Sequence, residues 1–135
     1  ISDDGSSVSY TITSTSVAHI YVDVVIPSGP PEITFAFRWK CTGENAAGDD
    51  QYDYGRVFVA PTTITPVAGT QVSNTYRVGE IKYNLQATYV NESIVLSGAT
   101  YGGTTQRFIF SWNNDGSVGV DPPFVLDNII ISATY

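Results

Sequence analysis

The chain of 135 residues contains few basic side chains, one histidine, one cysteine and no methionine. Its 6 Lys and Arg residues against 13 Asp and Glu residues leave a formal net charge of -7. Nucleic-acid-binding proteins gather basic residues on one face, so this charge balance argues against a nucleic-acid partner. The sequence also lacks an apolar run near the roughly 20 residues of a membrane span, so we expect no membrane insertion. An acidic surface instead suits solubility and cation binding.

Cysteine and histidine are too scarce for most of the chemistry that they support in other proteins. Cys41 has no second cysteine for a disulfide or a zinc site, so we expect it to pack as a small apolar side chain. His19 begins a strand-like segment without the Ser or Cys context of a nucleophile. Surplus acids are usual on a negative chain and do not by themselves indicate a glycosidase pair. We therefore predict that the protein is not an enzyme.

Apolar residues alternate with polar ones along most of the sequence, as in strands that have one face in a core. The clearest case is "ITFAFRWK", whose apolar face would hold Ile33, Phe35, Phe37 and Trp39. The same alternation appears in three further segments, 7–13, 19–26 and 107–112. Helical spacing is nowhere convincing, and even the Gly-free and Pro-free stretch 80–97 alternates. Turn-forming loops separate these segments without an internal repeat or linker, which predicts one all-β sandwich domain over residues 1–135.

Four segments, in this order, resemble the choice-of-anchor and gingipain-type cleaved adhesin domains, a family of Bacteroidota surface modules: "AHIYVDVVIPSG", "FAFRWKCTGE" with "YDYGRVFVAPTTITPVAG", "YGGTTQRFIFSWNNDGSVG" and "PPFVLDNIII". The resemblance implies an antiparallel β-sandwich of the jelly-roll type, related in shape to MAM domains. It also implies an extracellular or cell-surface location. In the family, further strands precede the segment that looks like "ISDDGSSVSY", so we expect the family's upstream strand to lie outside this chain.

Oxygen-rich loops make a cation site the sharpest chemical hypothesis. Acids and amides cluster in the segments 3–4, 44–53 and 113–128. Calcium takes six to eight hard oxygen ligands, which such loops supply, and related adhesin sandwiches bind calcium near an edge. We predict three Ca²⁺ ligands: Glu44, Asp53 and Asp127. Asp53 and Asp127 lie in strand-like contexts, where an acid without a partner would be costly, and Glu44 lies in the loop before them. The alternative is that these acids cap turns or pair with Arg38, Arg56 or Arg107. In either case we read Asp127 and Asn128 as an edge anchor where the last strand begins, which either binds an ion or holds the preceding loop.

Loop tyrosines are the candidate ligand-binding residues. Tyr52, Tyr54 and Tyr101 lie in or beside loops, where exposed rings suit the apolar face of a sugar or a protein partner. Trp39 and Trp112 fall on the apolar faces of their segments, and we expect them in the core.

Three hypotheses about function follow. The first is a non-catalytic extracellular adhesion or binding module of a bacterial surface or secreted protein, stabilised by calcium, with host or environmental glycans or surface proteins as partners. The second is a filament subunit that self-assembles, or joins neighbouring domains, by strand complementation, because an unpaired sheet edge accepts a further strand. The Ser- and Thr-rich segment 6–17 is the candidate donated strand, unless it pairs within its own sheet. The third is a carbohydrate-binding appendage of a secreted hydrolase.

Overall fold

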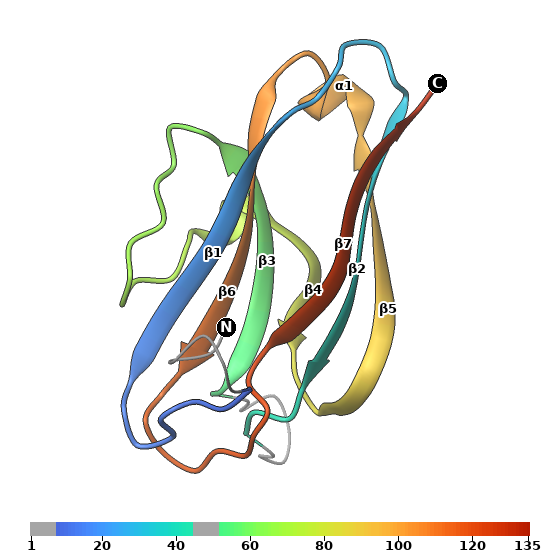
Figure 1. Ribbon diagram of the computed structural model, residues 1–135. Coiled ribbons are helices and arrows are strands. Elements are labelled where there is room, and N and C mark those ends of the chain that lie inside the picture. Colours follow the sequence, from blue (N-terminus) through green and yellow to red (C-terminus); the bar gives the residue numbers. More distant parts are fainter. Residues whose placement is uncertain (1–7, 45–51) are drawn as a thin grey trace.

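Two antiparallel β-sheets pack face to face in the computed structural model, which describes residues 8–44 and 52–135 (Figure 1). One sheet has the strand order β1-β6-β3-β4 and the other β5-β2-β7. The strands are β1 (Ser16–Val25), β2 (Glu32–Cys41), β3 (Tyr54–Pro61), β4 (Arg77–Tyr83), β5 (Gln86–Ser97), β6 (Thr105–Asn114) and β7 (Val125–Thr134), with a 3-10 turn η1 (Asn74–Tyr76) and a short helix α1 (Gly98–Tyr101). The prediction of an all-β antiparallel sandwich is confirmed. No helix in the described ranges is long and apolar enough to cross a membrane.

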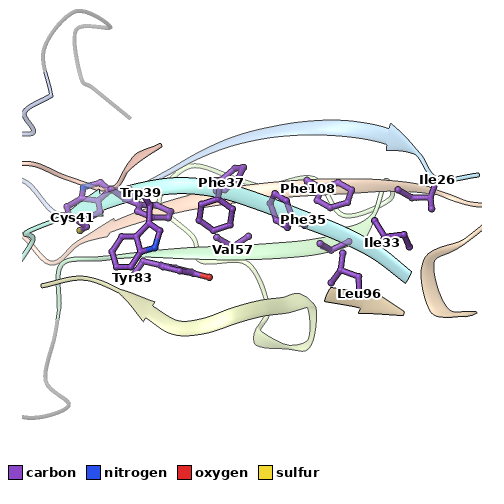
Figure 2. Packing of buried hydrophobic residues seen from close by; sticks show 14 of the residues in the cluster. Ile26, Ile33, Phe35, Phe37, Trp39, Cys41, Val57, Tyr83, Leu96 and Phe108 are labelled. Atoms are coloured by element: carbon purple, nitrogen blue, oxygen red, sulfur yellow. The ribbon is translucent and has the colours of Figure 1, made fainter. Parts of the chain in front are cut away.

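The core lies between the sheets and is built largely from aromatic rings (Figure 2). Alternate residues of β2 face alternate residues of β6, as the sequence predicts. The ring centroids of Phe35 and Phe108 are 4.9 Å apart, and those of Phe37 and Phe110 are 5.3 Å apart, both edge to face. This geometry places the positive ring edge against the negative ring face, which adds to the hydrophobic contribution. Trp39, Trp112 and Cys41 are buried as expected.

The outer face of the four-stranded sheet is also covered, by the loop of residues 62–73. Phe58 and Ile109 on that face pack against Val72 in a second apolar cluster. His19 holds the loop, because its Nδ1 lies 2.6 Å from the Ser111 hydroxyl and its Nε2 lies 3.2 Å and 3.1 Å from the carbonyl oxygens of residues 67 and 70. The central strands β3 and β6 are therefore buried on both faces.

The expected strand over residues 7–13 is wrong, since no strand forms from Val8 to Thr15. The side-chain amide of Asn114 donates to the carbonyl oxygens of Thr11 and Ser14, 2.9 Å each, and the amide of Ser14 donates to Thr11. Side-chain bonds of this kind hold a backbone in a turn and compete with a sheet ladder. The described part of the candidate donated strand is thus a turn followed by the start of β1.

Candidate functional site

Three carboxylates meet at one end of the sandwich: Glu44, Asp53 and Asp115 have ligand oxygens within 4.8 Å of one another. Glu44 follows β2, Asp53 precedes β3 and Asp115 follows β6. Because β3 and β6 are antiparallel, with Tyr54 opposite Asn113, the start of one strand lies beside the end of the other. We call this group the carboxylate cluster. It unites two of the predicted ligands with an acid of the 113–128 loop.

Asp53 is the fixed centre of the carboxylate cluster. Its side chain is fully buried and accepts hydrogen bonds from the Tyr10 hydroxyl at 2.7 Å and from the Asp115 amide at 2.9 Å. Glu44 is also buried and accepts from the Tyr52 amide at 3.3 Å. Asp115 is more accessible and accepts from the amide of Ser117 at 2.8 Å. Each carboxylate oxygen has two lone pairs, so these bonds orient the acids and leave acceptor capacity.

Burial works against the charge of two of these acids. Burial, and then the neighbouring Asp115, raise the pKa of Glu44 above its ordinary value. Burial also raises the pKa of Asp53, although the bonds from Tyr10 and the Asp115 amide oppose the shift. Burial and the bond to Asp53 raise the pKa of Tyr10, so Tyr10 stays a donor. A divalent cation bound between these acids would favour their charged forms, and three carboxylates are hard oxygen ligands that fit calcium.

Asp127 lies elsewhere, on the outer face of the three-stranded sheet. It stands opposite Arg38 in the β2–β7 register and pairs with it at 3.5 Å, with side chains 46% and 41% exposed. The premise that an acid in this strand is buried was wrong. The register shifts between Ala36 and Arg38, and Asn128 adopts a positive φ of 49°, so a bulge turns this part of β7 toward solvent. The ion pair expected as the alternative is the one that forms.

The three candidate tyrosines do not form one platform. Tyr52 is exposed beside the carboxylate cluster. The cationic groups of Arg56 and Lys82 lie over the Tyr54 ring, 4.7 Å and 4.9 Å from its centroid. Tyr101 belongs to α1, which precedes the other end of β6. Since β6 has 10 residues at about 3.3 Å each, roughly 30 Å separates the two ends.

Tyr101 instead borders a cavity of about 240 Å³ between α1 and η1, the α1–η1 cavity. Its lining comes from the ends of β3 and β6 and from the two short helical turns: Val59, Pro61, Thr75, Tyr76, Thr100, Tyr101 and Gln106. The sequence indicated Tyr101 but gave no signal for Tyr76 or Gln106, which join it only through the fold.

No strand of the described residues covers the side of the sandwich between β1 and β7. Ile20 and Val22 stand opposite Phe110 and Phe108 in the β1–β6 register and so share their core-facing side. They are nevertheless 42% and 49% exposed, and Ile129 of β7 is 43% exposed. These side chains border an apolar groove of about 130 Å³, the β1–β7 groove, lined by Ile20, Tyr21, Val22, Phe108, Phe110 and Ile129.

Comparison with known proteins assigns no function to these features. The chain matches no protein-family model, and no curated protein matches it significantly.

Proposed function

We propose that this chain is a non-catalytic, extracellular binding module that recognises a protein partner through the β1–β7 groove. The observation that carries the proposal is the exposure of core-facing apolar side chains along that groove. Apolar side chains that gather in an exposed groove, rather than lie singly on the surface, are candidates for an interaction site. The resemblance of four segments to bacterial surface adhesin modules supports adhesion at the cell surface as the setting.

The proposed occupant is an extended segment of the partner, with apolar side chains at alternate positions. β7 pairs only with β2 among the described strands, so its other edge offers backbone donors and acceptors to an added strand. The start of β1 is less available, because the Gly69 amide donates to the Val17 carbonyl at 2.8 Å. The groove beside β7 is close in size to an engineered cavity of about 150 Å³ that binds benzene, so one or two apolar side chains would fill it.

Two neighbouring isoleucines of β7 provide a matched test. Ile129 lines the β1–β7 groove, whereas Ile130 pairs with Ala36 and faces the outside, and the two are 43% and 58% exposed. A blocked peptide of about seven alternating Val and Thr residues serves as the probe, measured by calorimetry. We expect binding to the unmodified chain and to Ile130→Lys.

The variant Ile129→Lys places a charge at the groove, and we expect it to lose binding at least about tenfold. Circular dichroism checks that both variants keep the sandwich. Equal affinity of the two variants, or no binding of the peptide to the unmodified chain, would remove the groove as the recognition surface.

A second candidate, a self-assembling filament subunit, draws on the same open side, because the added strand can come from another copy. Light scattering over a concentration series tests it. Growth of the particle mass that Ile129→Lys abolishes supports assembly by strand addition. A monomer at every concentration contradicts it and leaves a separate partner as the source of the strand.

Calcium would serve this module as a rigid clamp rather than as a catalyst. The carboxylate cluster joins the ends of β2 and β6 to the start of β3, and Asp53 ties the segment around Tyr10 to the same point. An ion held there would fix the loops at this end of the sandwich without contact to the β1–β7 groove.

A further inference from the structure

We propose that the α1–η1 cavity binds a single neutral sugar ring, which is a second recognition site beyond the strand-binding groove. The cavity lies where α1 and η1 meet the ends of β3 and β6. The groove is lined from β1, β6 and β7 and shares no residue with it. The two sites can therefore be tested separately.

A buried acceptor without a donor is the first reason. Gln106 is only 7% exposed, and its Oε1 has no hydrogen-bond partner among the described residues. The orientation of the amide is set by its neighbours: the Thr104 hydroxyl donates to the Tyr101 carbonyl, so it accepts from Gln106 Nε2 at 2.9 Å. Oε1 is left as the free acceptor. Buried polar atoms are usually paired, and Gln106 Oε1 is one of four unpaired buried side-chain atoms among the described residues and the one that belongs to a residue lining this cavity, where a water or a ligand hydroxyl can serve as its donor.

The remaining lining selects the kind of ligand. Tyr76 and Tyr101 are half-buried and contribute ring surface, and Thr75 and Thr100 add hydroxyl groups at exposed positions. Rings suit the C–H face of a pyranose, while hydroxyls and the amide suit its hydroxyl groups. None of the lining side chains is charged, so an ionic ligand would lose its hydration without a counter-charge.

The size of the cavity limits the ligand to one ring. Its volume of about 240 Å³ lies below the roughly 300 to 1,000 Å³ of sites for drug-sized molecules. It exceeds the roughly 150 Å³ that accommodates benzene, so a six-membered ring with substituents fits. A ligand of about a dozen non-hydrogen atoms typically binds with a Kd on the order of millimolar.

The experiment is a titration of the ¹⁵N-labelled chain, followed by NMR, with glucose, galactose, mannose and N-acetylglucosamine, each to about 50 mM to exceed the expected Kd. We expect at least one sugar to give saturable shifts at Thr75, Tyr76, Tyr101 and the side-chain amide of Gln106. No saturable shift with any of the four sugars overturns the proposal. Saturable shifts that map to Tyr52 instead of the cavity also overturn it.

Variants separate the cavity from the rest of the surface. We expect Tyr101→Ala to weaken binding about tenfold, while the matched change Tyr52→Ala at the other end of the sandwich leaves it unchanged. Gln106→Met keeps the length of the side chain but removes the acceptor, so it should abolish the shifts. Melting curves check that each variant is folded. Undiminished binding by Gln106→Met would contradict the proposed role of the amide.

Discussion

The bond between Tyr10 and Asp53 gives the sharpest stability prediction. Tyr10→Phe removes the hydroxyl that donates to Asp53 Oδ2 at 2.7 Å, and it keeps the ring that packs edge to face on Trp112 at 4.9 Å. A hydrogen bond to a charged group contributes about 1.5 to 3 kcal/mol, and here the buried carboxylate would lose one of its two donors and keep the Asp115 amide. We expect the free energy of unfolding to fall by that amount at neutral pH.

For a domain of this size, 1 kcal/mol shifts the melting temperature by about 3 to 4 °C, so the expected decrease is about 5 to 12 °C. Differential scanning calorimetry in chelator measures it. The matched control is Tyr89→Phe, at an exposed ring over which Arg38 and Lys40 lie. Phenylalanine keeps that ring contact, so we expect a change within about 0.5 kcal/mol.

The pH dependence tests the cause. Burial raises the pKa of Asp53 above 3.8, so in the folded protein Asp53 takes up its proton as the pH falls toward that value. The bond from Tyr10 then becomes a neutral one, which contributes about 0.5 to 1.5 kcal/mol. The effect of Tyr10→Phe should therefore become smaller as the pH falls toward 3.8. If Tyr10→Phe is as stable as Tyr89→Phe at neutral pH, or if its effect is the same at neutral and acidic pH, the Tyr10 hydroxyl does not stabilise a charged Asp53.

Three further predictions concern the same end of the molecule. Calcium at about 100 times its Kd should stabilise the chain by about 2.7 kcal/mol at neutral pH. Asp53→Asn should abolish this stabilisation, and Asp127→Asn should keep it. If calcium leaves the melting temperature of the unmodified chain unchanged, the ion does not bind. In chelator, Glu44→Gln should raise the melting temperature at neutral pH but not near pH 4. The raised pKa means that the charged form of Glu44 destabilises the fold, and this cost exists only at pH values above the ordinary pKa of 4.5. A lower melting temperature at neutral pH would contradict this. Gly55→Ala would place a methyl group against the ring of Phe124, closer than van der Waals contact allows. Chemical denaturation should therefore show a loss of about 1 to 3 kcal/mol, and a neutral effect would contradict this close packing.

The alternation of side chains predicted the central strands, because the inward face of a central strand is buried at any position between its neighbours. The burial of Phe35 and Phe37 in β2 could be predicted from this alternation alone. Alternation could not predict which strands lie at an edge. Ile20 follows the same pattern as core residues and Ile129 begins a run of three isoleucines, but no neighbouring strand covers either in the described part of the chain, so both remain exposed.

The sequence could predict that the candidate site is built from acids, but not which acids the fold brings together. The sequence indicated acids in strand-like contexts, and Asp53 is indeed buried. Asp115 joins it only because β3 and β6 are neighbours, and a bulge keeps Asp127 on the outside. Likewise, the burial of Ser111 on the outer face depends on the loop that His19 holds. Each outcome depends on strand order, register or loop position, which local patterns do not encode.

Hydrogen exchange can show whether the edge of β7 that no described strand occupies accepts a further strand. The amides of β7 would be compared with those of β5, the opposite edge of the same sheet, with and without the alternating Val and Thr peptide. We expect the peptide to slow exchange in β7 and to leave β5 unchanged, and we expect Ile129→Lys to remove the protection. Protection of β5, or exchange in β7 that the bound peptide leaves unaltered, would contradict this expectation.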